Sequence, residues 1–456
     1  MNIFKQPDEP AVESYFYWKG RWLDELKATC RETWQLNQQE FQRSRSLIAD
    51  AIEDARFSKI QWFKVIFRVM VTAAVFLGTF IWTPLLLLLA VTAAGCLCLA
   101  YVFIALLLMG GEYLFLKIHG LFKLCPHCHE RVSLPVYECP QCHVRHMNLV
   151  PSPRYGLFYR RCASSGCGAK IPVTRITGRK TLHAFCRKCN RPLEQVDYVP
   201  MTLAFMGGPS VGKTMIFHSL AAKVLPEVSS TMGLSTVVNN NEEKDKLNRM
   251  EAWIQNGEFP QATQNRAIDA FCVDLVKSTG GYPYRLYLYD PPGESFRSTN
   301  DLRVHTYYNH LKSVIWVFDP FTLERIRSEF AGDQKLLEGV KVGAMSPERC
   351  LELWLIGLKK EFSGVLKGLN CAVAINKTDV SELASLTGLK AGDDDAACRE
   401  FLDRYGCAGF VNTLERTFSH VRFFAVSAVG QSASGGAFQP IGLDGVMKWV
   451  LGQMLA

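Results

Sequence analysis

Short apolar runs alternate with amphipathic segments of helical length across residues 200–456. The apolar runs read MTLAFMG, AIDAFCVDLV, YRLYLYD, SVIWVFD, CAVAIN and VRFFAVS. Runs of this length, separated by helical segments, are typical of a doubly wound α/β sheet with helices on both faces. Only KSTGGYP separates the second run from the third. The pattern therefore predicts that these two strands pair as a hairpin.

A second pattern lies upstream, where the stretch from Val69 to Gly111 contains no Asp, Glu, Lys or Arg. A helix needs about 20 apolar residues to cross a bilayer, so this stretch predicts a two-helix transmembrane hairpin over residues 62–116. We expect the turn near Thr83 and Pro84. Basic residues flank both outer ends, namely Arg56, Lys59, Lys64, Arg68, Lys117 and Lys123. The positive-inside rule then places both termini in the cytoplasm. A long helix buried in a soluble core is the competing interpretation.

Residues 1–60 carry apolar side chains at helical spacing among many charges, which predicts one or two cytoplasmic amphipathic helices. Such helices either form an arm for partner binding or self-association, as in a homo-oligomer, or pack on the body of the protein. The sequence leaves both interpretations open.

Eight of the sixteen cysteines form four close pairs between the apolar stretch and the α/β region. The pairs are Cys125 with Cys128, Cys139 with Cys142, Cys162 with Cys167, and Cys186 with Cys189. Close pairs of this kind are typical of zinc ribbons in a reducing compartment, and disulfides are the competing interpretation. We expect the first two pairs to form one ribbon over residues 121–148 and the last two a second over 158–194. Each would hold one Zn²⁺ by four thiolates, with His127, His129, His143 and His146 as bystanders.

The ribbon region is basic. Between Lys117 and Pro200 there are fourteen Lys or Arg and four Asp or Glu, whereas the whole chain has a formal net charge of +8. Because the region follows a membrane segment, we favour anionic lipid headgroups or a protein effector as its partner over nucleic acid. A solvated surface without a partner remains open. The short connection RPLEQVDYVP leads directly into the α/β region, which predicts that the metal and α/β modules influence each other.

The stretch GGPSVGKT matches the phosphate-loop pattern GxxxxGK[ST], and it lies between an apolar run and a helical segment as that loop requires. It comprises Gly207, Gly208, Pro209, Ser210, Val211, Gly212, Lys213 and Thr214. The glycines allow backbone N–H groups to surround a β-phosphate, while Lys213 reaches the β and γ oxygens and the Thr214 hydroxyl ligates Mg²⁺.

Three further stretches follow in the order that a GTP site needs. In LYLYDPPGE, Asp290 can hold the Mg²⁺ shell through water and Gly293 can donate its N–H to the γ-phosphate. In AINKTD, Asp379 can accept two hydrogen bonds from guanine, which adenine cannot supply. Asn376 and Lys377 belong to the same stretch, and Ser427 and Ala428 of FFAVSAVG are placed to back the base. Together they predict GTP or GDP with Mg²⁺ as the ligand.

With these motifs, residues 200–456 resemble the translation-factor-related (TRAFAC) class of P-loop GTPases. The chain looks most like the double-GTPase type domains of bacteria that are fused to zinc ribbons and membrane segments. The resemblance implies a Ras-like sheet and a GTP-hydrolysing switch at the cell inner membrane. Glu294 occupies the place of the water-orienting glutamine of Ras-like members, so we expect slow intrinsic hydrolysis. The alternative is a zinc-ribbon membrane scaffold that binds GTP structurally with little or no hydrolysis.

The threonine that would complete the Mg²⁺ shell is open between three positions. Thr263 in GEFPQATQN lies just before the second apolar run and is favoured for that reason. Thr231 and Thr236 lie further upstream in a longer insertion.

Overall fold

The computed structural model describes residues 21–55, 61–78, 81, 83–152, 156–259, 270–292, 306–330, 342–343, 345–361, 368–430 and 436–456. They fall into two compact units. The helical unit comprises the described residues up to 117 together with 134–185, and the sheet unit comprises 118–133 and 186–456.

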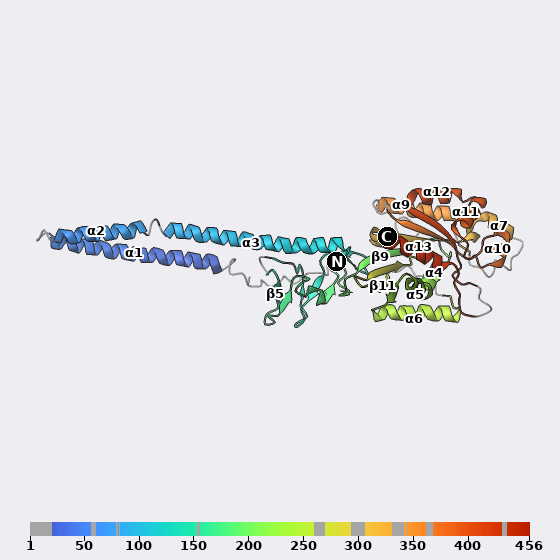
Figure 1. Cartoon of the computed structure of the whole chain (residues 1–456), viewed down its shortest axis with the longest axis horizontal. Coiled ribbons are helices and arrows are strands. Elements are labelled where there is room, and N and C mark those ends of the chain that lie inside the picture. The colour runs from blue at the N-terminus through green and yellow to red at the C-terminus, as the bar shows by residue number, and fades with distance from the viewer. Residues whose placement is uncertain are drawn as a thin grey trace, which may run out of the picture. The chain divides into compact units, whose positions relative to one another are not determined.

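The sheet unit contains a seven-stranded sheet (Figure 1). In spatial order its strands are β10 (Leu234–Val237), β11 (Phe271–Lys277), β12 (Tyr284–Tyr289), β9 (Val199–Met206), β13 (Ser313–Phe318), β14 (Asn370–Ile375) and β15 (His420–Ala425). The last five are parallel, whereas β11 runs antiparallel to both β10 and β12. All six strands predicted from the sequence are therefore confirmed, as is the hairpin of β11 and β12. The sequence pattern missed β10, a short edge strand within the longer insertion.

Helices cover both faces of this sheet (Figure 1). One face carries α4 (Lys213–Ser219), the π-helical segment η3 (Leu220–Val224), α5 (Leu225–Thr231), α6 (Asn241–Asn256) and α13 (Leu443–Leu455). The other carries α7 (Glu324–Phe330), α9 (Pro347–Glu361), α10 (Ser381–Thr387), α11 (Asp395–Arg404) and α12 (Ala408–Thr417). Two short 3₁₀ segments are η6 (Thr306–His310) and η7 (Pro320–Thr322).

The alternation of side chains along β13 explains why both faces need helices. Ile315 and Val317 pack in the core with α4 and α13, whereas Trp316 and Phe318 pack in the opposite core with α9 and α12. Successive residues of a strand point to opposite faces, so a wholly apolar strand has to be covered on both sides. The predicted P-loop, doubly wound α/β fold is confirmed in the sheet unit.

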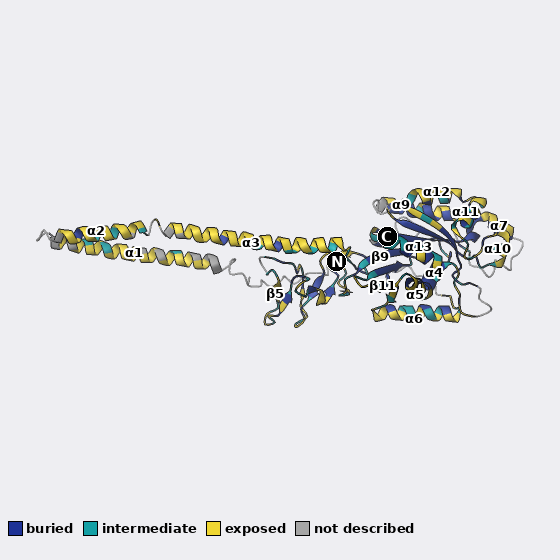
Figure 2. Cartoon of the chain, viewed as in Figure 1, coloured by how far each residue is buried: buried dark blue, intermediate teal, exposed yellow. Residues whose placement is uncertain are grey.

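The helical unit begins with three helices, α1 (Arg21–Ala55), α2 (Gln61–Leu77) and α3 (Thr83–Ile118). α1 packs along α2, and Arg68 Nη1 donates to the Leu47 carbonyl at 2.7 Å. α3 has 36 residues, so it spans about 54 Å, more than the roughly 30 Å of a bilayer core. Within it, Leu87–Ile118 is long and apolar enough to cross a membrane, and its side chains are largely exposed (Figure 2).

These helices differ from the predicted transmembrane hairpin. Thr83 and Pro84 start α3, because proline fits the first helical turn, where its missing N–H costs no intrahelical hydrogen bond. Along the described parts of the chain, however, α2 and α3 do not pack side by side as the two arms of a hairpin would. In those same parts, one helix is long and apolar enough to cross a membrane, whereas the predicted hairpin needs two.

The cysteine-rich segments form short strands that flank the turns carrying the cysteine pairs. These are β1 (Lys123–Leu124), β2 (Arg131–Val132), β3 (Val136–Glu138), β4 (Arg145–His146), β5 (Tyr159–Arg161), β6 (Lys170–Pro172), β7 (Ala184–Phe185) and β8 (Pro192–Leu193), with the 3₁₀ turn η2 (Arg179–Thr181). β1 pairs with β2, β3 pairs with β4 and β7, and β5 pairs with β6.

A buried ion pair joins the hairpin of β11 and β12. Asp274 and Arg285 lie directly opposite each other, with Nε to Oδ1 at 2.6 Å and Nη2 to Oδ2 at 2.7 Å. Both side chains are buried, and Arg285 also pairs with Glu194. Breaking such a pair leaves a charge in the interior, which costs more than losing an exposed pair.

We predict that Arg285→Ala lowers the free energy of unfolding of the sheet unit by about 3–5 kcal/mol, because Asp274 stays buried without the guanidinium. Urea unfolding followed by tryptophan fluorescence measures this. The matched control is Arg399→Ala, which removes a half-exposed arginine paired with Asp395 and Glu415. It should cost less than about 1 kcal/mol. Equal losses in the two variants would contradict the prediction.

Candidate nucleotide-binding site and metal centres

The loops that carry the sequence motifs meet at one edge of the sheet. Each lies within two residues of the carboxyl end of a parallel strand: the phosphate loop after β9, Asp290 after β12, Asp319 after β13, Asn376 after β14 and Ser427 after β15. Parallel strands have their carboxyl ends on the same side, and open α/β sheets bind ligands there. The fold thus brings together motifs that lie far apart in the sequence.

Two glycines of the phosphate loop are required by its geometry. Gly207 has φ +141° and Gly212 has φ +97°, which disfavour any L side chain. A Cβ on Gly207 would lie 2.6 Å from the Val317 carbonyl oxygen, and one on Gly212 would overlap the Asn376 amide. Ser210 has φ +61° at the tip of the same loop.

Lys213 is held inside the loop. Its Nζ donates to the carbonyls of Gly207 at 2.9 Å and Gly208 at 2.8 Å, and the side chain is buried. Burial lowers the pKa of Lys213, while the charge of Asp290 acts in the opposite direction. Phosphate oxygens are anionic acceptors that stabilise a buried ammonium group, so this position suits a phosphate.

Thr214 and Asp290 come together as the Mg²⁺ hypothesis requires. The Thr214 hydroxyl donates to Asp290 Oδ2 at 2.8 Å, joining the start of α4 to the end of β12. Oxygen donors of this kind are the ones that Mg²⁺ prefers, and Mg²⁺ commonly keeps several waters beside one or two protein ligands. The two residues therefore fit a magnesium ion.

Asn376 links three loops of the site. Its Nδ2 donates to the Val211 carbonyl at 3.1 Å, and its Oδ1 accepts from the Ala428 backbone N–H at 3.3 Å. Lys377, with φ +63°, donates from Nζ to the Ser210 carbonyl at 3.3 Å. Asn376 and Lys377 therefore both hold the phosphate loop in place.

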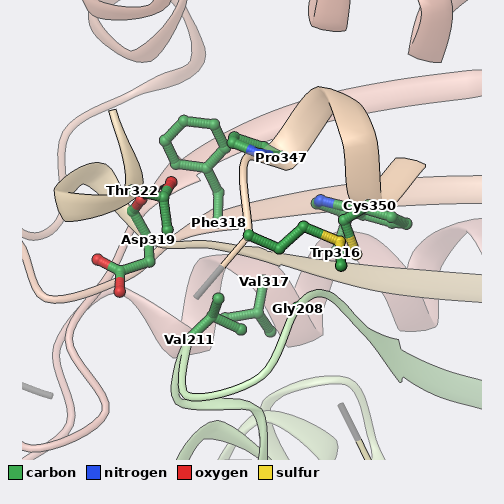
Figure 3. A pocket seen from close by; sticks show the side chains of 10 residues that line it. Gly208, Val211, Trp316, Val317, Phe318, Asp319, Thr322, Pro347 and Cys350 are labelled. Carbon is green, nitrogen blue, oxygen red and sulfur yellow. Dashed lines mark hydrogen bonds between the residues drawn. The ribbon is translucent and has the colours of Figure 1, made fainter. Parts of the chain in front are cut away.

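Asp319 is a site residue that the sequence analysis missed. Its buried carboxylate accepts from Lys377 Nζ at 2.5 Å and from the backbone N–H groups of Phe321 at 3.0 Å and Gly343 at 2.9 Å. The available signal was an aspartate at the end of a fully apolar strand, in WVFDP. Figure 3 shows this strand end between the loop that carries Val211 and the helix that carries Cys350. The small cavity there has about 10 Å³, enough for about one water and not for a nucleotide.

The residues predicted to read the base lie at the same edge of the sheet. Asp379 is partly exposed, and its carboxylate makes no hydrogen bond within the described part of the chain. Ser427 is buried, and its hydroxyl accepts from the N–H groups of Val429 at 3.2 Å and Gly430 at 2.7 Å. Ser427 thus shapes the loop, while the Asp379 carboxylate is available to a ligand.

Three predicted site residues, Thr263, Gly293 and Glu294, lie outside the described residues. The two alternatives to Thr263 lie in regular structure. Thr231 ends α5 and donates to the Val228 carbonyl at 2.7 Å, and Thr236 lies in β10 at the edge of the sheet.

The eight paired cysteines form two tetrads. In each tetrad the four Sγ atoms lie within 4.8 Å of one another. The sheet tetrad is Cys125, Cys128, Cys186 and Cys189, all in the sheet unit. The helix tetrad is Cys139, Cys142, Cys162 and Cys167, all in the helical unit. No histidine belongs to either tetrad.

The predicted grouping of the cysteine pairs is therefore wrong. Residues 121–148 and 158–194 each supply half of both tetrads instead of one complete ribbon. The first pair combines with the fourth and the second with the third. The physical reason is strand pairing, because β3, which follows the first pair, aligns Val136 with Phe185, directly before the fourth.

Both tetrads fit a tetrahedral zinc ion. The closest Sγ distances are 3.5 Å for Cys125 to Cys189 and 3.3 Å for Cys142 to Cys162. Zn–S bonds of about 2.3 Å imply S–S separations of about 3.8 Å. Burial raises the pKa of Cys128 to about 11 and that of Cys162 to about 12, so these thiols hold protons that a metal must displace.

No protein-family model matches the chain, and no curated protein matches it. Among solved structures, the chain is similar to the G domain of the FeoB iron transporter of T. maritima. That match has 16% sequence identity and a TM-score of 0.23, and it covers 56% of this chain and 98% of the other.

Zinc stoichiometry distinguishes the two groupings. Replacing Cys125, Cys128, Cys186 and Cys189 by Ser should leave about one zinc per chain, because the helix tetrad stays intact. The sequence-based grouping expects no zinc, since both ribbons would lose two ligands. Replacing Cys125, Cys128, Cys139 and Cys142 by Ser should leave no zinc, because each tetrad then loses two ligands. The sequence-based grouping expects one zinc instead, held by the intact second ribbon. Metal content of the purified chains, measured by mass spectrometry, decides between them.

Proposed function

We propose that this protein is a membrane-anchored GTP-binding protein that hydrolyses GTP slowly and acts as a nucleotide-dependent switch. The observation that carries the proposal is the Asn376 side chain, which joins the phosphate loop to the loop of Ala428. Asp379 lies three residues after Asn376 in the same motif. This arrangement supports a nucleotide whose phosphates lie at Lys213 and whose guanine lies at Asp379.

The roles of the residues follow from their chemistry. Backbone N–H groups of the phosphate loop and Lys213 bind the β and γ phosphates, while Thr214 and Asp290 hold Mg²⁺. A Mg²⁺ ion held there would supply positive charge to neutralise the phosphates. Glu294 would place a carboxylate where Ras-like proteins orient water with glutamine, so a partner that supplies another group would raise the rate. A scaffold that binds GTP without turnover is the second candidate, and the same Glu294 favours it.

The membrane part of the proposal rests on α3 and its link to the helix tetrad. Arg179 forms an ion pair with Glu112 of α3 and donates to the carbonyls of Leu149 and Val173, both at 2.8 Å. Arg175 lies over the Phe115 ring at 5.4 Å. We propose that α3 crosses a bacterial inner membrane and that the ribbon docks where α3 emerges into the cytoplasm, where thiols stay reduced.

Partners of two kinds fit the exposed surfaces. The basic ribbon region suits anionic lipid headgroups or an acidic protein effector better than nucleic acid. Exposed apolar side chains on α1, such as Trp34 and Leu36, suit a partner helix or a second copy of the chain.

Lys213→Ala should abolish nucleotide binding and turnover, because the variant loses the contact to the β and γ phosphates. We would measure GTP hydrolysis by zinc-loaded protein in anionic liposomes, with this variant as the blank. Turnover that persists in the variant would contradict the proposal. GTP binding without turnover in the wild type would favour the scaffold.

Asp379→Asn should weaken GTP binding by about 100-fold or more and improve binding of xanthosine triphosphate, because the amide can donate to the xanthine oxygen. Competition with a fluorescent nucleotide gives both affinities. Asp393→Asn, on the turn before α11, is the control and should bind GTP as the wild type does. Unchanged base selectivity in Asp379→Asn would remove its assigned role.

A further inference from the structure

The turn that carries Cys125 and Cys128 touches the sheet at three places. The Pro126 carbonyl accepts from the Ala270 N–H at 3.2 Å, and the Leu124 carbonyl accepts from the Tyr287 hydroxyl at 2.9 Å. The His129 ring lies against Tyr289 and Tyr307. All these residues belong to the sheet unit, so the sheet tetrad is part of the domain that carries the phosphate loop.

His129 is held by the metal-binding turn and reaches into the core. Its N–H donates to the Cys125 carbonyl at 2.9 Å, and its φ of +55° is set by the turn. The buried ring meets Tyr289 edge-on at 5.1 Å and Tyr307 at 5.7 Å. These two tyrosines stack on each other at 4.4 Å, and both are fully buried. Rings packed in this way move together, because a close-packed core leaves them no free volume.

Tyr289 is the last residue of β12, and Asp290 follows it directly. Asp290 in turn accepts the Thr214 hydroxyl at 2.8 Å in the proposed magnesium position. A continuous chain of contacts therefore runs from the sheet tetrad through His129 and Tyr289 to Asp290. Four thiols fix the turn only when a metal ties them together, because protonated thiols are weak hydrogen-bonding groups.

The helix tetrad provides a natural comparison. It has the same chemistry, and its turn at Cys139 repeats the geometry of the turn at Cys125, with the His143 N–H donating to the Cys139 carbonyl at 3.1 Å. It lies in the helical unit, where its ribbon contacts α3 through Arg179. None of its four cysteines takes part in the contact between His129 and Tyr289.

We propose that zinc at the sheet tetrad positions Asp290 through His129 and Tyr289, so that zinc at this tetrad, and not at the helix tetrad, strengthens Mg²⁺-dependent nucleotide binding. The inference rests on the proposed function for its nucleotide readout. His129 is a positioning residue in this scheme, since it touches neither nucleotide nor Mg²⁺.

The first test compares two variants of the full chain in which all four cysteines of one tetrad are replaced by Ser. Affinity for fluorescent GTP is measured with Mg²⁺ and with excess EDTA. The sheet-tetrad variant should lose about 10-fold in affinity with Mg²⁺ and change little in EDTA, as expected when the support of a metal ligand is removed. The helix-tetrad variant should match the wild type in both. Equal losses in both variants, or equal losses with and without Mg²⁺, would overturn the inference.

The second test keeps all eight cysteines. His129→Ala should retain two zinc ions per chain yet lose several-fold in Mg²⁺-dependent affinity, and His129→Phe should recover most of it. Ala and Phe share the same backbone strain at positive φ, so their difference reports the ring. Identical affinities for the two variants would overturn the role of His129.

Amide hydrogen exchange without nucleotide separates this inference from the proposed function. Tyr289 and Asp290 should exchange faster in the sheet-tetrad variant than in the helix-tetrad variant. Equal exchange overturns the inference even if the protein binds GTP. If the wild type binds no nucleotide and the sheet-tetrad variant still exchanges faster than the helix-tetrad variant, the zinc link to Asp290 is supported. Only the nucleotide proposal is then overturned.

Discussion

The amide of Asn376 is the interaction on which the rest of the site depends. It spans the gap between β9 and β14 by donating to the phosphate loop and accepting from the loop after β15. Gly212 has to be glycine because this amide occupies the space of a Cβ. One side chain thus fixes the relative positions of the segments proposed to bind phosphate and base, and a buried amide with both ends satisfied tolerates little displacement.

Asp319 and Lys377 extend this bracing to the other side of the phosphate loop. The ion pair is buried at the aspartate and is supplemented by two backbone N–H donors, which satisfy the carboxylate. A buried pair of charges adds little net stability but restricts geometry, because each charge is costly without its partner. In this protein the ion pair restricts the position of the Ser210 carbonyl at the tip of the loop, because Lys377 also donates to that carbonyl.

The metal centres differ in what they support, although their ligands are alike. The turn of the sheet tetrad packs through His129 against Tyr289, the residue before Asp290. The ribbon of the helix tetrad contacts α3 through Arg175, which lies over Phe115. One zinc ion would thus organise the ligand edge of the sheet and the other the exit of the candidate membrane helix. This division is possible because the cysteines of the helix tetrad lie, along the chain, between the two cysteine pairs of the sheet tetrad.

Local patterns in the sequence predicted six of the seven strands of the large sheet, the phosphate loop and the cysteines of both tetrads. An apolar run of strand length, a GxxxxGK[ST] loop and a close cysteine pair can each be recognised from neighbouring residues alone, without knowledge of the rest of the fold. The candidate membrane span in α3 also follows from composition alone. Only the tertiary structure decided which segments, distant in the sequence, come together in space. Four similar cysteine pairs are chemically equivalent, so the pairing of Val136 with Phe185, and not any spacing, selects which of them share a metal. Likewise, Asp319 gains its role only because folding places Lys377 and Gly343 around it.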